Sequence, residues 1–170
     1  MAADGIVIER LKAFCYNSAM QNKLKYYDEA TKKLMLQATD YEVPQLGKFS
    51  LEEMVFLLRE SFKYKLTYKK VFGELIERNC DPATGFCLVS SYYIYEKTGE
   101  DKIWTLKKSA LHWWLQHNQY SGPFDITYTQ FKDPYPYYIG VPETKIYTDE
   151  DFKKILQEKA YILGKQAGLE

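Results

Sequence analysis

The chain has 170 residues, of which 23 are basic and 23 acidic, so its formal net charge is zero. A balanced charge argues against a nucleic-acid-binding protein, which usually carries a basic excess, although it does not exclude a local basic patch. Hydrophobic residues make up 46% and charged residues 27%, which is typical of a globular chain and not of a disordered one. This length suits one domain, and we expect residues 1–170 to form it.

The first ten residues, MAADGIVIER, contain neither a basic n-region nor a long apolar region, so we expect no secretory signal. No apolar run approaches the ~18 residues that a membrane span requires. Three cysteines, an odd number, fit a reduced protein better than a disulfide framework. The sequence therefore predicts a cytoplasmic protein with no membrane partner.

Helical spacing of apolar residues dominates roughly the first 75 residues. Ser50 and Glu53 form a capping box that predicts a helix start, and Pro44 and Gly47 interrupt the pattern before it. The expected helices lie within 6–20, 28–41, 50–62 and 67–79.

The centre of the chain combines one further helix with strands. Residues 87–99 follow a turn-forming run and end at a glycine, which favours a helix over a strand of the same composition. Alternating patterns at 110–117 and 124–131 predict two strands of a hairpin, and a short strand is expected at 102–106.

The last part is expected to be an ordered loop at 132–144, followed by a helix at 149–168 that Thr148 and Asp151 cap. This order of elements predicts an α+β fold in which N-terminal helices pack on a small antiparallel sheet, with a C-terminal helix. The chain then divides into a helical part at 1–78, a candidate catalytic core at 79–131, and the loop and helix of 132–170.

Cys87 is the first candidate for chemistry, because it follows a glycine-containing turn at an expected helix start. The free N–H groups and the dipole at a helix N-terminus favour a thiolate, and the N–H of Cys87 could serve as one oxyanion donor. A buried core cysteine is the alternative reading of the same residue.

His112 and Asp125 each lie near the beginning of an expected strand. If those strands pair, both side chains could face Cys87, so that His112 acts as the base and Asp125 fixes its tautomer. Without that pairing, His112 would be a hydrogen-bonded core histidine and Asp125 a turn acid. The sequence thus predicts a Cys87–His112–Asp125 triad, provided that the fold brings the three side chains into contact.

Three further residues are candidates for substrate binding or for the oxyanion hole: Asn79, Trp114 and Gln130. His117 should point to the opposite face of the strand from His112, so we expect a structural or exposed side chain. A zinc site from Cys80, Cys87 and the two histidines has unusual spacing, and a Cys80–Cys87 disulfide is disfavoured in a reducing compartment. No glycine-rich phosphate loop is present, and we expect no cofactor and no metal.

The order of a cysteine at a helix start, then histidine, then aspartate resembles the papain-like and transglutaminase-like thiol superfamily. More narrowly, the segments GFCLVSSYYIYEKTGEDKIW, HWWL and FDITYTQF are similar to a small group of bacterial proteins called YunG-like, over roughly residues 79–131. The resemblance implies a thiol enzyme with a papain-like core. Two positions depart from the group's pattern: Phe86 stands where a glutamine is usual, and Trp113 follows His112 where a tyrosine is usual.

Two classes of function follow. The first is a cysteine-dependent hydrolase or acyltransferase that acts on an amide, isopeptide or ester bond of a peptide, protein or small amide. The second is a non-catalytic module on the same scaffold that binds a protein or ligand, as a bacterial or phage host-interaction protein would. The sequence leaves the oligomeric state open.

Overall fold

The computed structural model describes residues 48–74, 81–119, 122–133 and 135–170. The chain divides into two units, Met1–Leu36 and Gln37–Glu170, and every described residue belongs to the second. The helices expected at 6–20 and 28–41 lie outside the described residues, and so does the candidate residue Asn79. That residues 1–170 form one domain stays a prediction.

Two short helices open the described part. Helix α3, Leu51–Phe62, begins with the predicted capping box: Ser50 Oγ accepts from the Glu53 N–H, and the Glu53 carboxylate accepts from the Ser50 N–H. Helix α4, Lys65–Phe72, ends at Gly73, whose φ of 79° is the left-handed conformation that glycine adopts most readily. The helix expected at 67–79 therefore begins earlier and ends earlier than its sequence pattern indicated.

Helix α5, Cys87–Thr98, confirms the helical reading of the central segment. Nearly all of its residues are buried, including Tyr92, Tyr93 and Ile94, which explains why its sequence has no clear amphipathic stripe. It ends at Gly99, as predicted. A short 3₁₀ helix, η2, follows at Glu100–Lys102.

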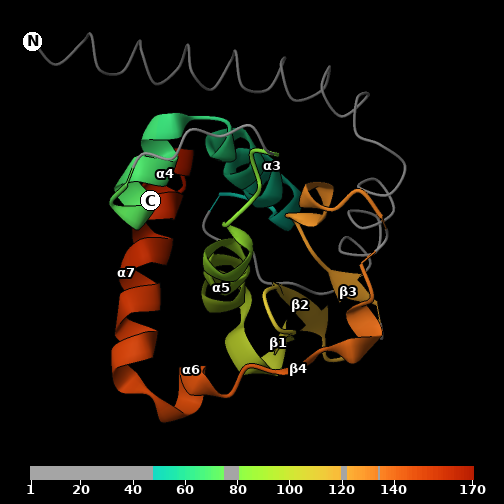
Figure 1. The fold of residues 1–170 in the computed structure, drawn as a ribbon. Coiled ribbons are helices and arrows are strands. Elements are labelled where there is room, and N and C mark those ends of the chain that lie inside the picture. Colours follow the sequence, from blue (N-terminus) through green and yellow to red (C-terminus); the bar gives the residue numbers. More distant parts are fainter. Residues whose placement is uncertain (1–47, 75–80, 120–121, 134) are drawn as a thin grey trace, which may run out of the picture. The chain divides into compact units, whose positions relative to one another are not determined.

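A four-stranded antiparallel sheet has the order β3–β2–β1–β4. Its centre is the hairpin of β1, Trp104–Lys108, and β2, Trp113–His117. The two edge strands are β3, Pro123–Phe124, and β4, Val141–Pro142. The described part of the chain is therefore α+β, with helices α3 to α7 and one small sheet (Figure 1).

The strand expected at 124–131 is wrong beyond its first residue. After Phe124 the chain leaves the sheet, because the Asp125 side chain accepts from the Thr127 N–H and closes a local turn, and the 3₁₀ helix η3 follows at Tyr128–Gln130. The loop expected at 132–144 contains the 3₁₀ helix η4, Tyr137–Ile139, and then strand β4.

The end of the chain forms the short helix α6, Lys145–Thr148, and the long helix α7, Glu150–Ala167. The predicted cap is wrong: Asp149 caps α7 by accepting from the Phe152 N–H, whereas Thr148 belongs to α6 and donates to the Thr144 carbonyl. Gly168 ends α7 in the left-handed conformation.

Helix α5 is central to the packing, since one side contacts strands β1 and β2 and another contacts α7 (Figure 1). Helices α3 and α4 pack mainly against α7. Among the described helices, α5 therefore covers the sheet, and the expectation that N-terminal helices would do so is wrong for α3 and α4. None of the described helices combines the length and the apolar character needed to cross a membrane.

Candidate active site

Cys87 is the first residue of α5, and the turn before it is defined by local hydrogen bonds. The Asp81 carboxylate accepts from the Ala83 N–H, the Asp81 carbonyl accepts from the Thr84 N–H, and Gly85 has a φ of 86°. The first N–H groups of any helix lack acceptors within it, so the start of α5 presents backbone donors beside the thiol. Cys87 itself is buried, with 6% of its surface exposed.

His112 lies just before β2, where the turn of the β1–β2 hairpin is closed by a hydrogen bond from the Ser109 N–H to the His112 carbonyl. The imidazole Nε2 is 2.7 Å from Asp125 Oδ2, and both side chains are almost completely buried. Among the described residues, Nδ1 makes no hydrogen bond. Since Asp125 occupies Nε2, Nδ1 is the nitrogen available to the thiol of Cys87.

Asp125 is the anchor of the site, because both of its carboxylate oxygens accept hydrogen bonds. Oδ1 accepts from the Thr127 N–H at 2.8 Å and from the Thr127 hydroxyl at 2.7 Å. Oδ2 accepts from the Tyr137 hydroxyl at 2.8 Å and faces His112. A buried carboxylate is tolerated only when it is paired and hydrogen-bonded in this way.

The charge state of His112 follows from these neighbours. Burial by itself would lower the pKa of His112, but the hydrogen bond with Asp125, the interaction with the Cys87 side chain and the charges of both raise it to about 9. The Cys87 thiol therefore lies close enough to raise the pKa of His112, although it forms no well-aligned hydrogen bond with Nδ1. Catalytic hydrogen bonds are often long or poorly aligned when no substrate is bound. The arrangement favours an imidazolium at neutral pH.

Further contacts fix the loop that bears Asp125. Arg59 of α3 donates from Nη1 to the Ile126 carbonyl at 2.6 Å, and its guanidinium lies over the Tyr128 ring. The Thr129 hydroxyl donates to Asp81 Oδ1 at 3.0 Å, which joins this loop to the turn before Cys87. The nucleophile loop and the aspartate loop are thus held by shared hydrogen bonds.

Aromatic rings surround the imidazole on several sides. Trp114 stacks on it with a centroid distance of 5.7 Å, and Phe131 and Tyr135 meet it edge-on at 4.6 and 4.7 Å. The Tyr135 hydroxyl is also hydrogen-bonded to the Ser109 hydroxyl. These rings exclude water from the His112–Asp125 pair, and they also cover it.

The structure brings Cys87, His112 and Asp125 together, whereas the candidates for substrate binding, Trp114 and Gln130, have structural roles. Trp114 is buried beneath His112, with only 1% of its surface exposed. Gln130 donates from Nε2 to the Thr127 carbonyl and hydroxyl at 3.0 Å each, so it supports the Asp125 turn. His117 is buried at the edge of the Trp104 ring, and burial lowers its pKa.

Phe86, where the resembled proteins have a glutamine, is a core residue. Its ring stacks on Phe62 at 4.5 Å and lies near Phe72 at 5.3 Å, so it joins α5 to α3 and α4. In this chain the position packs the core and offers no polar group to a substrate.

Sequence reasoning missed three residues that support the site: Arg59, Thr127 and Tyr137. Thr127 had a local signal, because a threonine two residues after an aspartate is typical of a side-chain-stabilised turn. Arg59 and Tyr137 had none, since their contacts depend on the tertiary fold.

Within the described ranges, no group of three or more histidine, cysteine, aspartate or glutamate side chains could hold a metal ion. Comparison with known proteins gives no family: no family model, no curated protein and no solved structure matches the chain. We therefore infer the function from the geometry of the site.

Proposed function

We propose that the protein is a cysteine-dependent hydrolase or acyltransferase that uses Cys87 as nucleophile, His112 as acid and base, and Asp125 as the residue that orients the imidazole. The observation that carries the proposal is the 2.7 Å contact between His112 and a fully hydrogen-bonded, buried Asp125, with the remaining imidazole nitrogen available to a cysteine at a helix N-terminus. These are the groups and roles that nucleophilic acyl transfer requires.

In the proposed reaction, the Cys87 thiolate attacks the carbonyl carbon of an amide, isopeptide or ester, and a C–S bond forms. The tetrahedral oxyanion is stabilised by backbone N–H groups at the start of α5, including that of Cys87. The C–N or C–O bond then breaks as imidazolium His112 gives its Nδ1 proton to the leaving group, which leaves a thioester. Water or an amine next attacks the thioester while His112 takes its proton, and the thiolate is restored.

We further propose that the fold is of the papain-like or transglutaminase-like type, and that the resemblance to YunG-like proteins reflects common ancestry. The arrangement that supports this is a helix beginning at the cysteine, packed on an antiparallel sheet whose hairpin carries the histidine. A single domain in the cytoplasm, with a peptide, protein or small amide as substrate, completes the proposal.

One observation favours the second candidate, a non-catalytic binding module. The three residues are 2–6% exposed, and Tyr135 and Tyr137 lie against the His112–Asp125 pair. Because Cys87 is buried, a substrate carbonyl reaches it only if the residues around the site move. If they never do, the same hydrogen bonds would serve stability alone.

Acylation by p-nitrophenyl acetate separates the two candidates, because this activated ester requires little specific recognition. We expect an initial burst of p-nitrophenolate, with the acetyl group found on Cys87 by peptide mass spectrometry. Cys87→Ser and His112→Gln should abolish the burst. Lys107→Gln, a half-buried lysine of β1, serves as the matched control and should retain it.

Adding a primary amine to the same assay distinguishes hydrolysis from transfer. An acyltransferase gives the acetylated amine as product, whereas a hydrolase releases acetate whatever the amine concentration. Absence of any Cys87 acylation in the folded wild-type protein would exclude the enzyme and leave the binding module.

A further inference from the structure

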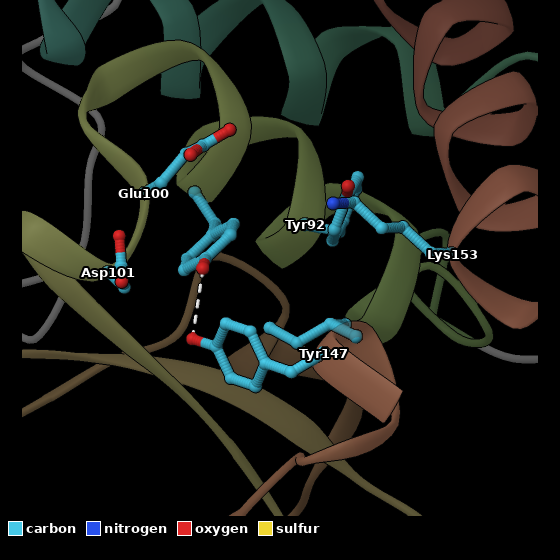
Figure 2. Close-up of a pocket in the computed structure, with 7 residues that line it drawn as sticks. Tyr92, Glu100, Asp101, Tyr147 and Lys153 are labelled. Atoms are coloured by element: carbon cyan, nitrogen blue, oxygen red, sulfur yellow. Dashed lines mark hydrogen bonds between the residues drawn. The ribbon is translucent and has the colours of Figure 1, made fainter. Parts of the chain in front are cut away.

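A pocket of about 220 Å³ lies at the C-terminal end of α5, between that helix, η2, α6 and α7 (Figure 2). Cys87 begins α5 and Gly99 ends it, so the pocket and the candidate active site lie at opposite ends of a helix about 18 Å long. The residues that line the pocket are Tyr92, Tyr95, Glu100, Asp101, Ile146, Tyr147 and Lys153.

The charged groups of the pocket are separated by sign. Figure 2 shows Glu100 and Asp101 on one side and Lys153 on the other. Among the described residues, none of these three side chains forms a hydrogen bond or ion pair. Two carboxylates and one ammonium group are therefore available to a ligand.

The negative charges of the carboxylates contribute to raised pKa values of the pocket tyrosines. Burial and the charges of Glu96 and Glu100 raise the pKa of Tyr92 to about 12. Burial, the hydrogen bond with Tyr147 and the charges of Asp101 and Glu100 raise the pKa of Tyr95. The C-terminal end of the helix dipole adds negative potential on the same side.

The walls between the charges are aromatic and held in place. The hydroxyls of Tyr95 and Tyr147 are hydrogen-bonded at 3.0 Å, and the rings of Tyr92 and Tyr95 lie 5.8 Å apart (Figure 2). Ile146 adds an apolar surface. The volume is below the roughly 300 Å³ at which pockets for drug-sized ligands begin, so the pocket suits a smaller molecule.

We propose that this pocket binds a small zwitterion with an apolar side chain, of the size and charge of a free α-amino acid. Its ammonium group would face Glu100 and Asp101, its carboxylate would face Lys153, and its side chain would lie against the tyrosines and Ile146. A simple cation would be repelled by Lys153 and a simple anion by the two carboxylates. Glu100 and Asp101 are exposed and Lys153 is half-buried, so water solvates them in the free protein, but a ligand with both charges is the one that gains a favourable contact on each side of the pocket.

The test is a titration of the full-length protein with small ligands, monitored by two-dimensional NMR of the backbone amides. The probes are L-leucine, leucine methyl ester, which keeps only the positive charge, and N-acetyl-leucine, which keeps only the negative charge. We expect saturable shifts at the end of α5, in η2 and in α6 with leucine, and binding about tenfold weaker or worse with either analogue, because each loses a charged contact.

Variants of the three charged residues test whether leucine binds in this pocket. Glu100→Gln combined with Asp101→Asn, and separately Lys153→Gln, should each weaken leucine binding about tenfold or more. The matched control is Lys154→Gln, which changes an exposed lysine next to Lys153 on the same helix and should leave binding unchanged. The amide spectrum of each free variant reports whether it is folded, and Lys153→Met gives a second test should Lys153→Gln unfold.

Three results would overturn the proposal: no saturable shift with leucine, equal binding of the methyl ester, or binding of leucine that Lys153→Gln leaves intact. The second would indicate a site for cations alone. None of these results bears on acylation of Cys87, so the two proposals stand or fall separately.

Discussion

Replacing Asp125 by asparagine should change the protonation of His112 more than any other single substitution. Burial lowers the pKa of His112, but the hydrogen bond and charge of Asp125, together with the interaction and charge of Cys87, raise it to about 9. Without the charge of Asp125, the opposing effect of burial is less well balanced, and we expect the pKa of His112 to fall. The whole shift from 6.5 to about 9 corresponds to roughly 3 kcal/mol of preference for the imidazolium, of which Asp125 supplies the larger share and Cys87 the rest.

The assay is an NMR titration of the imidazole nitrogens between pH 5 and pH 10, in about one-unit steps near each transition. The chain has 2 histidines, so the spectrum is simple, and His117 serves as an internal reference whose pKa is lowered by burial. Asp133→Asn changes an exposed carboxylate on the following segment and should leave His112 at about 9.

One contradicting result is a wild-type His112 that titrates at or below 6.5. The other is a pKa of His112 that Asp125→Asn leaves unchanged. Either result would mean that the buried pair does not hold an imidazolium.

Three further predictions concern stability. First, His112 has a higher pKa in the folded protein than its ordinary 6.5, so its contribution to the free energy of unfolding is fully present below about pH 6.5 and is lost as the pH rises through about 9. Urea denaturation of the wild type should therefore give a lower free energy of unfolding at pH 9 than at pH 6.5, and Asp125→Asn should greatly reduce this difference. Second, Tyr137→Phe removes the hydrogen bond from the Tyr137 hydroxyl to the Asp125 carboxylate, so the free energy of unfolding measured in urea should fall by about 1.5–3 kcal/mol. An unchanged urea midpoint would show that this bond does not stabilise the fold. Gly164→Ala should lower the melting temperature although alanine favours helices by about 1 kcal/mol, because the added Cβ would lie 2.3 Å from a ring carbon of Tyr93; a stabilised variant would refute the close packing of α5 on α7.

The helices of the described part were predictable because their ends carry local signals. The capping box at Ser50 and the glycine after Thr98 depend on neighbouring residues alone, and both are found where the sequence places them. The antiparallel pairing of β2 with β3 was predicted from local alternation and a turn of hairpin length, whereas the pairing of β1 with β2 was not predicted.

Elements whose boundaries depend on distant contacts could not be predicted as well. The alternating pattern of 124–131 is typical of a strand, but the side chain of Asp125 bonds to its own turn and ends the strand at Phe124. Strand β4 has 2 residues and exists because Val141 and Pro142 meet β1, which no local pattern reveals.

For the candidate site, the sequence indicated which residues could meet but not what surrounds them. Cys87, His112 and Asp125 share a recognisable order, and the pairing of β2 with β3 places the last two side chains within hydrogen-bond distance. The aromatic cover and the support from Arg59 arise from segments far apart in the chain, so they depend on the fold.

The reactivity of Cys87 is the most direct test of the proposed triad. The measurement is the rate of alkylation by iodoacetamide near pH 6, followed by peptide mass spectrometry that distinguishes Cys87 from Cys15 and Cys80. We predict that Cys87 reacts faster than glutathione at the same pH, and that His112→Gln removes this excess while Lys107→Gln does not. A Cys87 that reacts no faster than glutathione, and that His112→Gln leaves unchanged, would contradict the assignment of Cys87 as a nucleophile.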